Sequence, residues 1–157
     1  MRNKKFLWGL AVTGFFIATL CLAATDVSVG TWKANLEKSK YNPGPAPQSS
    51  TVVIEGMGDK MKVIVEGTDG EGKAVHNEWT GKYDGKDYAV TGDPNTDSRA
   101  YKKVDDQTYD ITAKKGDKVM TTGKVVFSKD GKTRTVTTTG TNAKGQKFNN
   151  TVVYEKQ

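Results

Sequence analysis

A single histidine is the residue with the most obvious potential for chemistry. His76 is the only histidine among the 157 residues, and Glu78 follows it at the spacing that places both side chains on one face of a strand. One imidazole cannot form the ligand clusters that hold zinc, and no local motif supplies the partners of a catalytic triad. We therefore interpret His76 and Glu78 as a surface pair, and we expect no enzyme activity, no metal site and no cofactor.

Acidic side chains cluster at several points, and their spacing indicates turns. Oxygen-bearing side chains from Asp93 onward resemble the start of a calcium-binding loop. The sequence then departs from the calcium-loop pattern, because Ser98 stands at the position of the invariant glycine and Val104 at that of the bidentate glutamate. Asp105 and Asp106 also fall in a predicted turn, where aspartate is favoured for its hydrogen bonds to the backbone. These groups predict polar turns.

The elements that must position any site are short strands. Turn signals such as Asp69-Gly70 and Asp130-Gly131 recur every 9 to 15 residues, and the runs between them are rich in Val, Thr, Tyr and Ile with period-two alternation. An open meander of this length would expose two long edges. We predict an all-β, antiparallel up-and-down meander closed into a barrel. The ten predicted strands lie near residues 29–35, 50–55, 61–67, 73–80, 87–91, 98–104, 107–113, 118–127, 132–139 and 147–155.

Hairpin parity assigns side chains to the two faces of this sheet. With two-residue turns at Gly116-Asp117 and Asp130-Gly131, the residue numbers of each cross-strand pair add up to an odd number. Because unpaired charges are costly to bury, the face without Asp110 and Arg134 is predicted to be the inside. Arg134, Val125 and Phe127 are then directed outward. The inward residues are Tyr109, Ile111, Met120, Thr122, Val126 and Thr135, joined by Phe148, Val152 and Tyr154 if the turn at 143–144 keeps the parity.

Residues 1–24 have the order of an export signal peptide. A basic start at residues 1–5 precedes an apolar run at 6–20 and two alanines at 23 and 24. A retained membrane anchor is an alternative, although the apolar run is shorter than the ~20 residues of a typical spanning helix, and lipoprotein processing at Cys21 is another. We expect cleavage after Ala23 or Ala24, leaving a periplasmic or secreted protein with a single domain of residues 25–157 and no stable membrane insertion.

Cysteine content and charge exclude further classes. Cys21 is the only cysteine and lies in the predicted signal, so residues 25–157 contain no disulfide, thiol nucleophile or thiolate metal site. The signal also carries three of the 24 basic residues, which leaves 21 against 18 acidic ones and a net charge of +3. This balance gives little support to nucleic-acid binding. We expect a monomer with no nucleic-acid partner.

A proline-rich connector at residues 42–50 interrupts the strand pattern. Its three alternating prolines, Pro43, Pro45 and Pro47, favour an extended conformation. Such a connector is either a stiff surface loop or a cover across a barrel mouth or docking segment.

Both ends of the chain after residue 24 carry a resemblance to a known family. Gly30-Thr31-Trp32-Lys33 opens the first strand, and the chain ends Val153-Tyr154-Glu155-Lys156-Gln157. With the ten-strand layout, these motifs resemble the fatty-acid-binding-protein branch of the lipocalin superfamily. The resemblance implies a lipocalin-like barrel. The family's Arg-x-Tyr carboxylate clamp falls on Val152-Val153-Tyr154, so the tyrosine carries over and the arginine does not. The connector also replaces the two family helices, and export contrasts with the family's cytosolic location.

The function expected from these features is ligand binding. We expect an exported protein that holds a hydrophobic small molecule, lipid-like and apolar or weakly polar, inside the barrel. Because the clamp arginine is missing, neutral ligands should be preferred. Trp32 is expected to plug the barrel, and Trp79 could plug it or contact the ligand. A packed barrel that acts as an envelope or surface interaction protein is the alternative. The predicted ligand-binding residues are Tyr154, Val152, Tyr109, Ile111, Met120 and Phe148.

Overall fold

The computed structural model describes residues 26–142 and 144–157, and the predicted signal peptide lies outside this range. All regular structure in the described part is β. No described helix is long and apolar enough to cross a membrane. The strands are β1 (Gly30–Asn42), β2 (Ser49–Met57), β3 (Lys60–Thr68), β4 (Ala74–Gly81), β5 (Tyr88–Thr91), β6 (Ser98–Lys103), β7 (Thr108–Lys115), β8 (Lys118–Phe127), β9 (Thr133–Thr141) and β10 (Lys147–Lys156).

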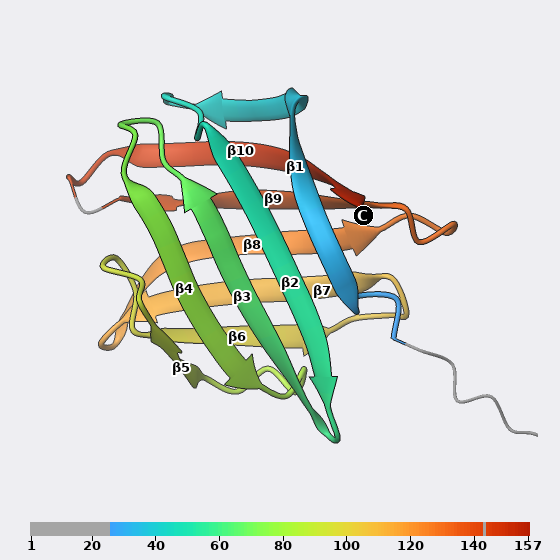
Figure 1. The fold of residues 1–157 in the computed structure, drawn as a ribbon. Helices are drawn as coiled ribbons and strands as arrows, with labels where there is room; N and C mark the ends of the chain where they lie inside the picture. Colours follow the sequence, from blue (N-terminus) through green and yellow to red (C-terminus); the bar gives the residue numbers. More distant parts are fainter. Residues whose placement is uncertain (1–25, 143) are drawn as a thin grey trace, which may run out of the picture.

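The ten strands form a closed antiparallel barrel in which each strand pairs with its neighbour in sequence. β1 pairs with β10 and closes the barrel, which confirms the predicted fold class. Figure 1 shows β2, β3 and β4 crossing steeply over β6–β10, so the barrel is flattened into two layers. Strand boundaries agree with the prediction to within a few residues, except that β1 continues to Asn42.

The extension of β1 follows β10 and leaves β2. β1 pairs with β2 only from Gly30 to Lys33. Between Asn35 and Lys40 its register on β10 shifts, and the strand then continues along β10 to Asn42. The upper end of β1 therefore turns across the top of the barrel (Figure 1), and a gap in pairing separates it from the start of β2.

A β-bulge in β8 makes part of the predicted facing wrong. Lys114 pairs with Val119, but Ala113 pairs with Thr121, so Met120 is an extra residue that reverses the parity of the rest of β8. The predicted inward and outward residues are therefore exchanged in the rest of β8 and in β9. Val125 and Phe127 are buried and Val126 is 42% exposed, while Thr122 is exposed and Thr135 pairs with Val126 on the outer face.

The same bulge brings Arg134 into the barrel. Arg134 pairs with the buried Phe127, and only 6% of its surface is exposed, so the prediction that it points outward is wrong. A second departure from the predicted pairing follows at the turn of residues 142–146. The residue numbers of each β9–β10 pair add up to an even number, and Arg134 lies opposite Tyr154. The two reversals cancel. Phe148, Val152 and Tyr154 therefore face inward as predicted, although the steps that led to the prediction were not correct.

Aromatic side chains fill one end of the barrel, and we call this cluster the aromatic floor. Its neighbouring rings lie 4.7 to 6.2 Å apart between centroids, mostly edge to face. Trp32 has no exposed surface, which confirms its predicted role as a plug, and Trp79 is also part of this packing. The aromatic floor consists of Trp32, Trp79, Tyr83, Tyr101, Tyr109 and Phe127.

Residues 26–29 seal the floor from below. The Ser28 carbonyl accepts a hydrogen bond from Trp32 Nε1 at 2.9 Å, and Ser28 Oγ lies 3.2 Å from Tyr83 Oη. Tyr109 Oη donates to Asp26 Oδ1 at 3.2 Å. Each polar atom of the aromatic floor named here thus has a partner, as buried polar groups require. The opposite end of the barrel, which we call the mouth, is where the hairpins at 69–72, 92–97 and 142–146 lie.

The proline-rich connector lies at the mouth. The Gln48 amide donates to the Thr68 carbonyl at 2.9 Å, and Pro45 packs against Gly70 of the β3–β4 turn. Pro43 and Pro45 border the same surface hollow as Asn95 and Asn142 from two other mouth turns. The connector is therefore part of the rim of the barrel.

Candidate functional site

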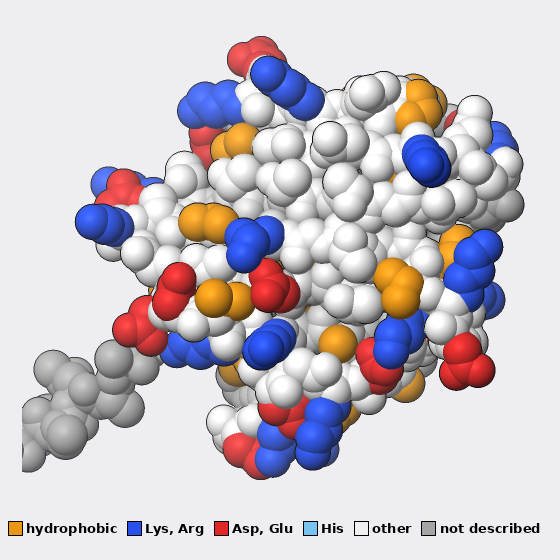
Figure 2. Space-filling model, turned by 180° about the vertical axis from the view of Figure 1, so that it is seen from behind, with side chains coloured by type: hydrophobic (Ala, Val, Ile, Leu, Met, Phe, Trp, Pro, Cys, Tyr) orange, Lys and Arg blue, Asp and Glu red, His pale blue; other side chains and the backbone are white. Residues whose placement is uncertain are grey.

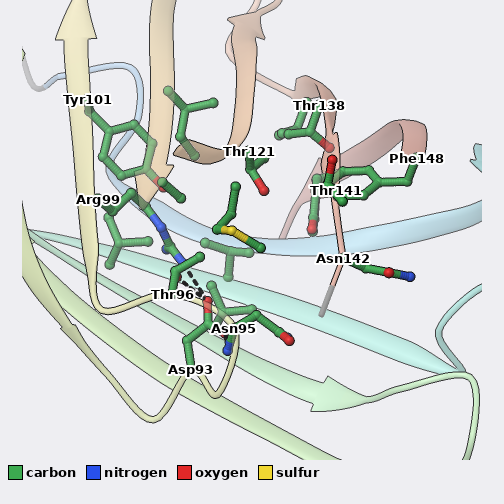
Figure 3. Close-up of a pocket in the computed structure, with 18 of the residues that line it drawn as sticks. Asp93, Asn95, Thr96, Arg99, Tyr101, Thr121, Thr138, Thr141, Asn142 and Phe148 are labelled. Carbon is green, nitrogen blue, oxygen red and sulfur yellow. Dashed lines mark hydrogen bonds and ion pairs between the residues drawn. The ribbon is translucent and has the colours of Figure 1, made fainter. Parts of the chain in front are cut away.

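A cavity of about 310 Å³ opens at the mouth and ends above the aromatic floor. Apolar side chains from β2, β3, β7 and β9 form much of its wall, and polar side chains from the mouth turns surround its upper part. Figure 3 shows Thr121, Thr138 and Phe148 on the side opposite Arg99. The interior is thus filled at one end and hollow at the other. Residues that line the cavity include Val52, Val63, Val65, Asp93, Arg99, Tyr101, Ile111, Met120, Arg134, Val136, Thr138, Phe148 and Tyr154.

Four of the six predicted ligand-binding residues lie together on this wall: Ile111, Met120, Phe148 and Tyr154. Tyr109 does not join them, because it is buried in the aromatic floor with its hydroxyl directed to Asp26. Val152 faces inward but borders a separate side pocket.

Arg99 projects from β6 toward the mouth turn at residues 92–97. Only 8% of its surface is exposed, and its Nη2 lies 3.6 Å from Asp93 Oδ2 and donates to Asn77 Oδ1 at 3.4 Å. Asp93 is itself held in place, because it accepts hydrogen bonds from Thr96 Oγ1 at 2.6 Å and from the Asn95 amide at 2.9 Å (Figure 3). The segment that resembles a calcium loop is therefore a polar turn whose carboxylate partly neutralises Arg99.

Arg134 has a different environment at the base of the cavity. Its guanidinium carbon lies 4.7 Å from the Tyr154 ring centroid and 5.9 Å from that of Phe127. Its Nε has no hydrogen-bond partner, and no carboxylate in the described part of the chain lies within the 4.0 Å of an ion pair. Arg134 is thus a buried cation that contacts aromatic rings instead of an anion.

Tyr154 separates the cavity from a side pocket of about 160 Å³ in the gap between β1 and β2. Its hydroxyl oxygen lies 3.3 Å from Ser50 Oγ, across that gap. Tyr41 reaches the same pocket from the end of β1, and burial, reinforced by the nearby Tyr154, raises the pKa of its phenol. Val152 borders this pocket as well, so the last strand contributes to both hollows.

The histidine pair predicted from the sequence lies on the outer surface. His76 Nδ1 is 3.2 Å from Glu66 Oε1 and its Nε2 is 3.3 Å from Glu78 Oε1, with about half of the imidazole exposed. In the part of the chain that the structure describes, no three His, Cys, Asp or Glu side chains are grouped to hold a metal ion.

Charges on the outside of the barrel are mixed. Figure 2 shows lysines and acidic side chains interspersed on the face turned away in Figure 1, with hydrophobic side chains scattered between them. The large apolar side chains with the greatest exposure are Met57 of β2, Val104 of the β6–β7 turn, and Val119 and Val126 of β8. The interior cavity is therefore a better-defined candidate site than this outer face.

Sequence reasoning missed the two arginines of the cavity and the inward residues of β9. The predicted parity directs Arg134 outward, and with it Val136 and Thr138 on the same face of β9. It does not include the bulge at Met120, and all three residues line the cavity. A local signal for Arg99 does exist: Arg99 and Tyr101 alternate on β6 opposite Ala113 and Ile111 of β7, in the period-two pattern of an inward face.

No protein-family model matches the chain, and no curated protein shows significant sequence similarity to it. The resemblance to fatty-acid-binding proteins therefore rests on the ten-strand layout and on the motifs at the two chain ends.

Proposed function

We propose that this protein binds a small molecule with an apolar body in the mouth cavity of the barrel. The observation that carries the proposal is the division of the interior into a filled aromatic floor and a hollow mouth of about 310 Å³. This volume falls at the lower end of the range of ligand pockets, and the wall combines apolar side chains with a few polar groups, as ligand sites do. A barrel that served only as a packed scaffold would gain stability by filling this space.

The proposal includes export, since residues 1–24 have the basic, apolar and small-residue order of a signal peptide. N-terminal sequencing of the protein isolated from its host should find Ala24 or Thr25 as the first residue. Recovery of the chain with Met1 in a cytosolic fraction would contradict export and leave the binding proposal in place.

Dye binding tests the cavity directly. An environment-sensitive apolar dye should bind the wild type, and Met120→Trp should abolish binding because the indole would occupy the cavity that Met120 lines. Val119→Trp is the matched control, since Val119 is exposed on the adjacent position of β8 and its replacement should leave binding unchanged. If the dye fails to bind the wild type, or binds Met120→Trp equally well, the packed-barrel interaction protein becomes the better hypothesis.

A further inference from the structure

A surface hollow of about 350 Å³ adjoins the cavity at the mouth, and we call it the mouth hollow. Asn95, Asn142 and Phe148 line both spaces, so a molecule seated in the cavity can continue into the mouth hollow. Figure 3 shows Asn95 and Asn142 on separate turns at the edge of the cavity. The two spaces differ in character, because much of the cavity wall is apolar whereas amides and carboxylates surround the mouth hollow.

Three amide side chains of the mouth hollow have hydrogen-bonding groups to spare. Asn95 bonds to its own turn only through its backbone amide, and its side chain has no partner among the described residues. Gln146 accepts from Asn142 Nδ2 through its Oε1 at 3.1 Å. Asn150 accepts from the Asn42 amide through its Oδ1, also at 3.1 Å. The NH₂ groups of Gln146 and Asn150 bond to no other residue in the described part of the chain, so the hollow offers several donors and one amide acceptor to a ligand.

The charged groups around the mouth hollow compensate one another. Glu71 pairs with Lys73 at 3.0 Å and with Lys144 at 3.6 Å. Asp69 Oδ1 accepts hydrogen bonds from the backbone amides of Glu71 and Lys73, each at 2.9 Å. A charged head group would compete with these existing pairs, whereas a neutral head group that carries hydroxyls can use the free amides.

We propose that the ligand is an amphiphile whose head group is a neutral polyol, a sugar ring, that binds in the mouth hollow while its tail occupies the cavity. This inference rests on the proposed function and names the chemical class of the ligand. Hydroxyl groups both donate and accept, so the adjacent hydroxyls of a sugar match the free amide groups of Asn95, Gln146 and Asn150. Phe148 lies where the two spaces meet and provides an apolar surface for the join between head and tail.

The two volumes set the sizes of the tail and the head. At about 30 Å³ for each water-sized group, the 310 Å³ of the cavity accommodates roughly ten non-hydrogen atoms and the 350 Å³ of the mouth hollow roughly twelve. An octyl chain fits the first space and one hexose ring the second. Octyl β-glucoside is therefore the probe, and 1-octanol provides the same tail without the sugar.

Calorimetric titration of the purified protein, below the critical micelle concentration of each amphiphile, tests the inference. Wild type should bind octyl β-glucoside about tenfold more tightly than 1-octanol, as one or two net hydrogen bonds provide. Asn95→Ala combined with Gln146→Ala should remove this preference and leave 1-octanol binding within about twofold. Asn149→Ala is the matched control, because Asn149 is an exposed amide on the outer face of β10, and it should change neither affinity.

A second measurement separates binding by the amides from a structural effect of the substitutions. Gln146 holds Asn142 within the β9–β10 turn, so its loss can loosen that turn. Asn95→Ala alone removes a side chain without a partner in the described structure. It should leave the melting temperature of the ligand-free protein unchanged and weaken octyl β-glucoside binding about threefold. A lowered melting temperature with equal losses for the glucoside and 1-octanol would assign Asn95 a structural role and overturn the inference.

A larger head group tests where the sugar lies. Because the mouth hollow is open to the surface, octyl β-maltoside, with a second sugar ring, should bind within about threefold of the glucoside. A head group enclosed in the cavity would have no room for the second ring. Loss of maltoside binding with retained glucoside binding therefore overturns the placement at the mouth.

The remaining outcomes distinguish this inference from the proposed function. Wild type that binds 1-octanol as tightly as octyl β-glucoside overturns the sugar head group and leaves the proposed function intact. Tighter binding of octyl phosphate or octyltrimethylammonium than of the glucoside overturns the neutral head group. If no molecule with an octyl tail binds, the cavity proposal itself is contradicted.

Discussion

Two tyrosines at the closed end of the barrel, the buried Tyr109 and the partly buried Tyr83, favour their neutral form. Burial raises the pKa of Tyr83 above its ordinary value of 10.0, although its hydrogen bond to Ser28 opposes the shift. Burial also raises the pKa of Tyr109, and the negative charge of Asp26 beside its hydroxyl adds to the effect. These residues gain packing from their rings and hydrogen bonds from their hydroxyls, but both contributions depend on the phenols remaining protonated.

This dependence predicts a loss of stability at high pH. Above about pH 10 the unfolded chain releases protons that the folded protein retains on Tyr83 and Tyr109, so the free energy of unfolding falls as pH rises. Denaturant titrations from about pH 8 to pH 11 should show this decline. Tyr83→Phe, which keeps the ring and cannot titrate, should decline less steeply. Parallel declines in wild type and variant would show that Tyr83 does not contribute.

At the scale of the elements, two glycines allow β8 and β9 to approach each other closely. A Cβ atom on Gly123 would lie 2.2 Å from the Thr137 carbonyl oxygen, and one on Gly140 would lie 2.1 Å from that of Met120. Glycine inside a strand commonly marks such close backbone approaches at barrel corners. The bulge at Met120 lies in the same region, and Met120 lines the cavity.

Gly123→Ala should therefore destabilise the barrel by about 1–3 kcal/mol, because the added methyl group overlaps backbone that cannot move freely. Thr122→Ala is the matched control on the next residue, whose side chain is exposed, and it should cost less than about 0.5 kcal/mol. Urea denaturation of the two variants measures the difference. Equal stabilities would indicate that β8 has room at Gly123.

The positions of the strands were predictable because turn signals and period-two patterns are local in sequence. Their facing was less predictable, since one unmarked bulge residue, Met120, reverses the facing of the rest of β8 and of β9. The rule that charged side chains face solvent usually identifies the outer face of a sheet, but it predicted the wrong face for Arg134. Sequence rules of this kind are expected to fail at functional or strained sites.

At the scale of the whole molecule, the barrel is filled at one end and hollow at the other. Sequence reasoning left cavity and packed core as alternatives, because the volume inside a barrel depends on how ten strands flatten and bend together. The structure combines the two. Aromatic residues from β1, β4, β6, β7 and β8, with Tyr83 from the β4–β5 connection, stabilise the floor, while the mouth is built from turns and the proline-rich connector.

Hydrogen exchange should reflect this division along the barrel. β5 has four residues and pairs through only two positions with each neighbour, and β1 leaves β2 beyond Lys33. β7, β8 and β9, in contrast, pair along most of their lengths beside the buried Tyr109 and Phe127. Local opening requires least free energy where pairing and buried contacts are fewest. Mass-spectrometric exchange should therefore be fastest in β5 and at residues 36–42 and slowest in the floor half of β7–β9. Protection of β5 equal to that of β8 would contradict this order and indicate that the barrel opens only as a single cooperative unit.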